Sequence, residues 1–250
     1  MKKALHWIVP GLLLLSVMGM VAIWAGWIGP EWEYLSAHRP YSIQWVIDPK
    51  GSGEKCLRFE LRNGDKWLSK GGSSLRSEIE TRERPRMNSE RWYRFSLMLP
   101  QDFPIEDNRL VLAQWHGVDK KYLGESARSP VMAFRYSSGT FSITMRHSAE
   151  RIVRNADAVP SKQLFETKSL SLNAWNDFVV QTRWSYTAEG FINIWWNGKP
   201  IVEYRGPVGY NDDLAPYFQF GIYRDETDKT YVSYMKGIRM GKTAQDVGFK

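Results

Sequence analysis

The chain has 250 residues, of which 43% are hydrophobic and 24% charged, a composition typical of a globular protein. This composition excludes a collagen-like, a largely disordered or a multi-span membrane protein. The single cysteine, Cys56, excludes an intrachain disulfide framework and a multi-cysteine zinc site. The net charge of +7 suits an acidic polymer as partner, and the 12 Trp and 12 Tyr residues are typical of β structure and of carbohydrate binding.

The first predicted element is a membrane segment. Two lysines precede an uncharged run from residue 8 to 28, which is long enough to span the hydrocarbon core as a helix. Trp24 and Trp27 lie near its far end, where aromatic residues anchor a span. We therefore expect residues 1–30 to be an uncleaved transmembrane anchor in the inner membrane of a bacterial-type cell envelope, with residues 31–250 as one periplasmic domain. A cleaved signal peptide, which would give a secreted domain, is the alternative.

From about residue 40 the apolar residues recur with a period of two, which predicts strands rather than helices. Turn sequences such as Ser138-Gly139 and Asn197-Gly198 separate these segments. Many short strands with regular turns predict an all-β antiparallel β-sandwich of the jelly-roll class. Stretches 117–130 and 157–170 lack a clear pattern, so we expect loops there that border a binding face. The predicted strands are 42–47, 56–61, 75–81, 92–99, 110–115, 131–136, 141–145, 178–184, 191–196, 218–223 and 231–240.

A row of charges lies on the strand predicted at 75–81. Arg76, Glu78 and Glu80 share one face of this strand, while Ser77 and Ile79 point the other way. Such a row is typical of a solvated surface, and it also suits the floor of a polar cleft.

The second motif places two polar side chains on one face of a strand. In Gln114-Trp115-His116, the amide and the imidazole point the same way and the indole points opposite. By itself this spacing is equally typical of a structural histidine.

The third motif runs from Tyr217 to Arg224. Tyr217, Gln219, Gly221 and Tyr223 share one face, and three apolar residues form the other. Gly221 is expected to leave room for a ligand to approach the sheet. Core packing explains the apolar face but leaves the polar face unexplained.

A guanidinium, an amide, an imidazole and a phenol on one face suit β-elimination from a uronic acid polymer. Arg76 and Gln114 would neutralise the uronate carboxylate, which acidifies the C5 proton and stabilises an enolate-like intermediate. His116 or Tyr223 would remove that proton, and Tyr223 would protonate the departing O4. This chemistry requires no metal and no other cofactor.

Seven short segments, taken in order, resemble those of the jelly-roll polysaccharide lyases, and most closely the heparin lyase I-like and glucuronan lyase families. The resemblance extends over most of the chain from about residue 52 to 241, and its motifs are also those of alginate lyases. It implies a β-jelly roll whose concave face binds an acidic polysaccharide, with His116 and Tyr223 in the catalytic positions and Arg76 and Gln114 in the carboxylate-binding positions. The segments are Arg76-Ser77-Glu78, Glu90-Arg91-Trp92-Tyr93, Leu99-Pro100, Gln114-Trp115-His116-Gly117, Trp175-Asn176-Asp177-Phe178-Val179-Val180, Trp195-Trp196-Asn197-Gly198-Lys199 and Tyr217-Phe218-Gln219-Phe220-Gly221-Ile222-Tyr223-Arg224.

Two residues depart from the family pattern. Glu80 stands where the alginate lyase pattern has Arg, and Gln219 stands where these families often carry Lys. Gln219 leaves one cationic contact to substrate missing, so we expect a less charged uronate polymer, such as a glucuronan-like polymer or a bacterial exopolysaccharide, rather than heparin. The strand segment 235–239 lacks the acidic residue expected near a family-type calcium site, so the sequence does not support a structural calcium.

Further side chains are predicted to contact substrate, because they share the motif faces or lie on neighbouring strands and loops. They are Glu78, Lys120, Arg135, Arg146, His147, Tyr217 and Gln219. Trp195 and Trp196 point to opposite strand faces, so at most one of them is expected to serve as a sugar platform.

Other classes of function remain open at this point. A non-catalytic acidic-glycan-binding module of the cell envelope is the main alternative, because the departures at Glu80 and Gln219 lie inside the motifs. A glycoside hydrolase needs a carboxylate pair, and Glu83 faces away from Glu78 and Glu80 on a regular strand. A purely structural envelope protein is a third alternative. Nucleic acid is not an expected partner, because the basic residues are dispersed.

Overall fold

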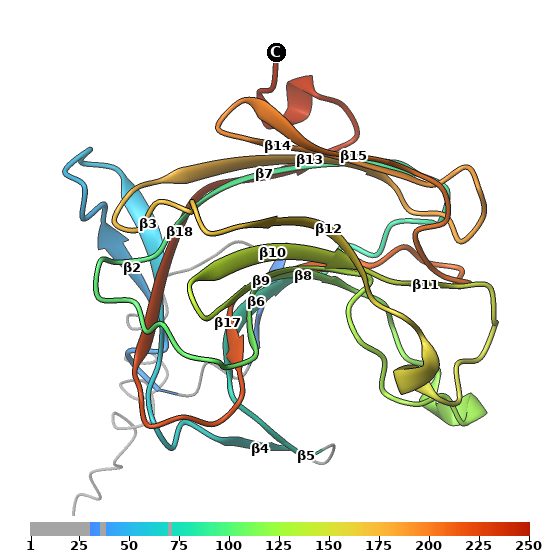
Figure 1. The fold of residues 1–250 in the computed structure, drawn as a ribbon, viewed down its shortest axis with the longest axis horizontal. Helices are drawn as coiled ribbons and strands as arrows, with labels where there is room; N and C mark the ends of the chain where they lie inside the picture. The colour runs from blue at the N-terminus through green and yellow to red at the C-terminus, as the bar shows by residue number, and fades with distance from the viewer. Residues whose placement is uncertain (1–30, 36–38, 70–71) are drawn as a thin grey trace, which may run out of the picture.

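The computed structural model describes residues 31–35, 39–69 and 72–250. Two large antiparallel sheets pack face to face, as Figure 1 shows. The predicted anchor, residues 1–30, lies outside the described residues. In the part of the chain that the structure describes, no helix is both long and apolar enough to cross a membrane.

The first seven-stranded sheet, which we call sheet A, carries the three motifs on adjacent strands. Its neighbouring strands are antiparallel, so strands distant in the sequence lie side by side. In spatial order they are β1 (Trp32–Leu35), β6 (Arg76–Thr81), β17 (Tyr217–Arg224), β8 (Leu110–His116), β9 (Met132–Ser137), β10 (Thr140–Met145) and β12 (Lys162–Thr167).

The second seven-stranded sheet, sheet B, covers one face of sheet A. In spatial order its strands are β15 (Lys199–Arg205), β14 (Phe191–Trp196), β13 (Asn176–Arg183), β7 (Glu90–Met98), β18 (Tyr231–Gly241), β3 (Lys55–Leu61) and β2 (Ile43–Ile47). The smaller elements are the hairpin β4 (Trp67–Ser69) and β5 (Gly72–Ser74), the parallel pair β11 (His147–Ser148) and β16 (Gly209–Tyr210), and the 3₁₀ turns η1 (Lys121–Leu123), η2 (Ala156–Ala158) and η3 (Gln245–Val247).

An aromatic core fills the space between the sheets. Trp115 and Phe218, on adjacent strands of sheet A, have ring centroids 4.8 Å apart, and Phe218 meets Phe95 of sheet B at 5.6 Å. All three side chains are buried. Each such side chain stabilises the fold by about 1.5–3 kcal/mol through removal of its apolar surface from water. This burial fixes which face of each strand points away from the core.

The period-two pattern predicted the sandwich correctly. Each predicted strand is present, with ends that shift by at most two residues, and Asn197 (φ 50°) and Gly198 (φ 76°) form the predicted tight turn. The prediction of a loop over 157–170 is wrong, because β12 pairs there with β10. β12 shows no clear alternation in the sequence, because it is an edge strand with several exposed, polar residues.

The C-terminal segment packs on the outer face of sheet B, at the top of Figure 1. Phe249 lies 4.8 Å from Trp195 between ring centroids, and Trp195 stacks on Trp92. Trp196 points the other way, into the core, where it stacks on Phe178. Both tryptophans considered as sugar platforms are therefore packed against other aromatic rings.

Gly221 is required by the backbone rather than by a ligand. Its φ is 136°, and the pairing of β17 with β8 shifts register between Phe220 and Tyr223. A Cβ at this position would overlap the carbonyl oxygen of Ser77 and lie 2.9 Å from the Cα of Glu78 and from the Phe59 ring in the core. Space for a ligand is therefore not the reason for this glycine.

We predict that Gly221→Ala lowers the free energy of unfolding by about 3 kcal/mol, because it combines backbone strain with a steric clash. Gly53→Ala is the matched control, because Gly53 also has a positive φ (76°) but has no neighbour within 4 Å of the added Cβ. Urea unfolding measures both variants. Equal losses in the two variants would contradict the clash with β6.

Candidate active site

The predicted motif residues lie on the face of sheet A that points away from sheet B, which we call the site face. The register pairs Tyr223 with Arg76 and Tyr217 with His116 across neighbouring strands. Figure 1 shows the β4–β5 hairpin below one side of sheet A and the loops with η1 and η2 below the other. The three motifs, which are distant from one another in the sequence, therefore form one surface.

A buried carboxylate connects Arg76 and Gln114. The Gln114 amide nitrogen donates to Glu78 Oε1 at 2.6 Å, and Arg76 Nη1 lies 3.5 Å from Glu78 Oε2. Glu78 is fully buried, and this burial raises its pKa while Arg76 opposes the shift. The prediction that Glu78 contacts substrate directly is thus corrected: Glu78 and Gln114, 0% and 1% exposed, are both buried, and of the three only Arg76 is partly exposed on the site face.

The two departures from the family pattern contact each other. The Gln219 amide nitrogen donates to Glu80 Oε2 at 2.8 Å, and Arg84 Nη2 donates to Glu80 Oε1 at 3.1 Å. The Arg84 guanidinium lies 3.8 Å from the Tyr217 ring centroid. Burial, together with the nearby Glu80, raises the pKa of Tyr217 to about 12. This part of the site face is close to neutral in charge.

His116 has a backbone carbonyl at each ring nitrogen. Nδ1 lies 2.7 Å from the oxygen of Gly117, and Nε2 lies 2.9 Å from the oxygen of Arg128. Burial lowers the pKa of His116 below its usual range, and the two carbonyls oppose this shift. Since both nitrogens face protein oxygens, neither is presented to a substrate in this arrangement.

The loop behind His116 is held by buried charges. Arg128 Nη2 donates to Asp212 Oδ2 at 2.9 Å, and the Lys120 ammonium pairs with the same carboxylate. Lys120 Nζ also donates to the carbonyl of Arg151 at 3.3 Å, and the residue is 9% exposed. The prediction that Lys120 grips substrate is therefore corrected, because its ammonium is already paired and serves to fix the loop.

Tyr223 lies between guanidinium groups. The Arg76 guanidinium carbon is 4.3 Å from the ring centroid, and that of Arg109 is 4.8 Å from it. Arg109 Nη1 also donates to the phenolic oxygen at 3.2 Å. Two positively charged guanidinium groups therefore contact Tyr223, and that of Arg109 also donates to its hydroxyl group.

Sequence analysis missed Arg109 because β8 is irregular. Counting by twos from Gln114 puts Arg109 on the core side, but the pairing of β8 with β9 shifts register between Val111 and Ala113. Leu112 and Ala113 both enter the core as a result. The available signal was the run Leu110–Ala113, which is apolar throughout and does not alternate.

Arg135 and Arg146 extend the positive charge across β9 and β10. Arg135 Nε donates to Thr144 Oγ1 at 3.0 Å. Among the described residues, neither arginine has a carboxylate within ion-pair distance. Burial, and the repulsion from Arg146 and Arg109, lower the pKa of Arg135 to about 10. The two guanidiniums are thus available for an anionic ligand.

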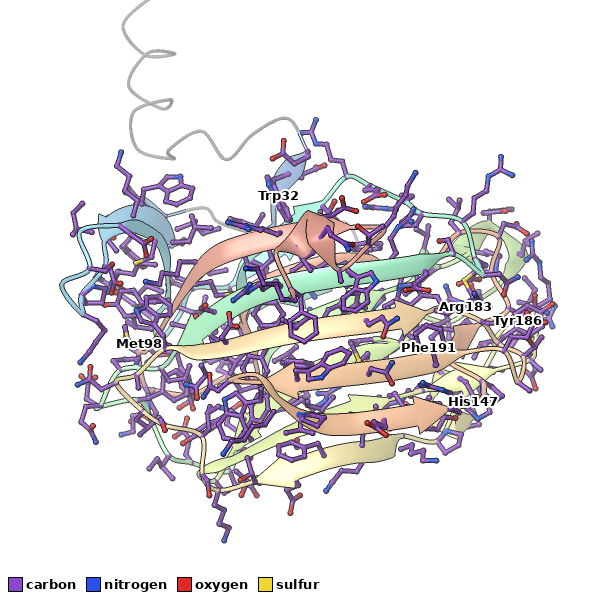
Figure 2. The ribbon with its side chains drawn as sticks, turned by 90° about the horizontal axis from the view of Figure 1, so that it is seen from above. Trp32, Met98, His147, Arg183, Tyr186 and Phe191 are labelled. Carbon is purple, nitrogen blue, oxygen red and sulfur yellow. The ribbon has the colours of Figure 1, made fainter. Side chains whose placement is uncertain are left out.

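His147 lies apart from this group. It is exposed on β11, in a shallow depression that it shares with Glu150 and Asn155. Figure 2 shows it at the end of the molecule where Arg183 and Tyr186 also lie. Since that depression contains none of the motif residues, the structure does not bring His147 together with Tyr223.

On the described part of the chain, no group of three or more His, Cys, Asp and Glu side chains is placed to hold a metal ion.

Comparison with known proteins places this chain in a family. The family model described as polysaccharide lyase matches residues 24–239. A search of curated proteins gave no significant match.

Solved structures share the fold. The endo-β-1,4-glucuronan lyase from the fungus Trichoderma reesei superposes with a TM-score of 0.72 at 17% identity, over 87% of this chain and 94% of that one. The alginate lyase AlyC3 gives a TM-score of 0.55 at 16% identity, over 79% of this chain and 77% of that one. The alginate lyase vAL-1 from Chlorella virus gives 0.52 at 11% identity, over 81% and 90%. With a family match over most of its length, this chain belongs to the polysaccharide lyase family and is an enzyme of that class.

Proposed function

We propose that this lyase cleaves a uronic-acid-containing polysaccharide by β-elimination, using its own side chains and no cofactor. The observation that carries the proposal is the position of Tyr223, which pairs with Arg76 in register and lies on the same sheet face as the buried Glu78–Gln114 pair. A proton-transfer group thus stands beside groups that bind a carboxylate.

Arg76, which is partly exposed, would bind the carboxylate of the reacting uronate, and the buried Gln114 would support it from within the sheet. The Gln114 amide nitrogen donates to Glu78 at 2.6 Å and so fixes the carboxylate with which Arg76 pairs. Neutralising the carboxylate stabilises the negative charge that develops when C5 loses its proton. Arg135 and Arg146, without carboxylate partners, suit a second acidic group of the polymer.

Tyr223 would then transfer the proton. Its phenolate oxygen takes the C5 proton, the C4–O4 bond breaks, and a C4=C5 double bond forms. The same tyrosine returns the proton to the departing O4, so atoms and charge balance without another reactant. This sequence suits a substrate whose C5 proton and O4 lie on the same side of the sugar ring.

His116 is less suited to the role of base. Both of its ring nitrogens lie within 2.9 Å of backbone carbonyl oxygens, and a base needs a free lone pair aimed at the proton. We assign His116 a positioning role beside Tyr217, with which it pairs across β8 and β17.

The substrate we propose is a glucuronan-like polymer or a bacterial exopolysaccharide of moderate charge. Glu80 cancels the charge of Arg84, and Gln219 adds none, so part of the site face is neutral. Highly sulfated heparin would leave anionic groups against this neutral part. The similar solved structures described above include an endo-β-1,4-glucuronan lyase and an alginate lyase.

A panel assay tests the reaction and the substrate together. The protein is mixed with glucuronan, alginate, heparosan, hyaluronan, heparin and bacterial exopolysaccharides, and the ultraviolet absorbance of the unsaturated uronate is followed. We expect the absorbance to rise with an unsulfated uronate polymer and not with heparin. New reducing ends without this absorbance would show hydrolysis instead, and binding without cleavage would indicate a glycan-binding module.

Two substitutions separate the roles of Tyr223 and His116. Tyr223→Phe removes only the transferable proton and is expected to lower kcat by about 10³-fold or more. His116→Gln keeps a hydrogen-bonding side chain and is expected to lower kcat by about tenfold. Circular dichroism and glycan binding verify that both variants fold. Equal losses of kcat would contradict the assignment of Tyr223 as the base.

We also propose that residues 1–30 anchor the enzyme in the inner membrane, with the lyase domain in the periplasm. The uncharged run from residue 8 to 28 after two lysines supports this location. Cell fractionation followed by protease treatment of spheroplasts measures it. We expect the protein in the membrane fraction and accessible from the periplasmic side, and a shortened soluble protein would show cleavage instead.

A further inference from the structure

An ion pair at the edge of the site face reaches the phenolic oxygen of Tyr223. Arg109, immediately before β8, donates from Nη1 to this oxygen at 3.2 Å and from Nε to Asp225 Oδ1 at 2.9 Å. Asp225 directly follows β17, two residues beyond Tyr223. One guanidinium therefore connects the tyrosine to a carboxylate on the same segment of chain.

The backbone holds this pair in place. The amide of Asp225 donates to the carbonyl of Arg109 at 3.1 Å and lies 3.2 Å from Asn108 Oδ1. About half of each side chain is exposed, which for an isolated surface pair would mean weak and mobile contact. Here the backbone bond holds the two residues side by side, and the guanidinium contacts both the carboxylate and the phenolic oxygen.

The charged groups that face Tyr223 come from each neighbouring element. Arg76 on β6 lies over its ring, Arg109 precedes β8 and also lies over the ring, and Arg135 on β9 pairs in register with Val111, as Tyr223 does from the other side. Two carboxylates supply negative charge to this group: Asp225 pairs with Arg109, and the buried Glu78 lies 3.5 Å from Arg76. Of the two, only Asp225 pairs with the arginine that donates to the phenolic oxygen.

We propose that Arg109 and Asp225 together adjust the readiness of Tyr223 to release and regain its proton. Arg109 is a positioning residue that stabilises the phenolate, and Asp225 holds it in place while moderating its charge. The inference rests on the proposed β-elimination, in which Tyr223 must first lose its proton to act as base. A weaker positive charge on Arg109 is useful because the Tyr223 oxygen must first take up the C5 proton and then donate it to O4.

Substitutions of Arg109 and Asp225 are expected to move the pH of half-maximal kcat in opposite directions. Arg109→Ala removes a charged hydrogen bond, so we expect kcat to fall by about 10- to 100-fold and the pH of half-maximal kcat to move higher. Asp225→Asn keeps an oxygen acceptor for Arg109 but removes the negative charge, so the same midpoint moves lower. Arg109→Lys keeps the charge without the two-pronged contact and should restore part of kcat.

A second measurement does not depend on turnover. Tyrosine labelled with carbon-13 at Cζ reports ionisation by NMR, and the Tyr223 signal is identified by its absence in Tyr223→Phe. The titration midpoints should rank Arg109→Ala above wild type and wild type above Asp225→Asn. Arg205→Ala is the matched control, because Arg205 also lies over an aromatic ring, that of Phe191 at 5.0 Å, on sheet B. It should leave both midpoints unchanged.

The outcomes are separable. Shifts of both variants in the same direction, or no shift of the Tyr223 signal in either, would overturn the role of the pair even if the enzyme cleaves its polymer. If no polymer is cleaved but the midpoints rank as expected, the proposed reaction fails and the electrostatic role of the pair stands.

Discussion

The contact between Trp115 and Phe218 fixes the strands that carry the site. Their rings lie 4.8 Å apart within the core, and both are fully buried. Because neighbouring residues on a strand point to opposite faces, burial of Trp115 places Gln114 and His116 together on the site face. Burial of Phe218 does the same for its neighbours on β17. The aromatic core lies on the opposite face of these strands, yet it determines the geometry of the motif residues on the site face.

Strands that are buried on one face could be predicted from the sequence. The alternation in β6, in β17 and in the last three residues of β8 gave the face on which each motif residue lies, because a one-residue slip would place polar or charged groups in the core. Edge strands gave less signal. β12 has exposed polar positions, and β15 contains Pro200, which an edge strand tolerates because one of its sides needs no donor.

The depth and the partners of each site residue could not be predicted in the same way. Alternation places Glu78 on the site face but does not show that other side chains cover it completely. Lys120 pairs with Asp212, 92 residues away, and no local pattern indicates such a contact. Arg109 reaches the site face because the register shift in β8 reverses the alternation before it. Each of these features depends on packing between distant segments.

Buried carboxylates order the positive charge of the site face. Taking Glu78 out of water costs several kcal/mol, which Arg76 and the Gln114 amide offset only in good geometry. This pairing makes the site rigid, since Glu78 gives the amide and the guanidinium each a fixed partner. It also weakens the attraction for a polyanion, because a paired arginine attracts negative charge less strongly than a free one.

The arginines without carboxylate partners therefore decide what the site face can attract. Arg135 and Arg146 repel each other across β9 and β10, and an anion placed between them would relieve this repulsion. The β6 side, where Glu80 pairs with Arg84, offers no such gain. A polymer with moderate charge satisfies both sides at once. A uniformly sulfated chain would gain on the first side and lose on the second, which is the physical basis for expecting an unsulfated uronate polymer.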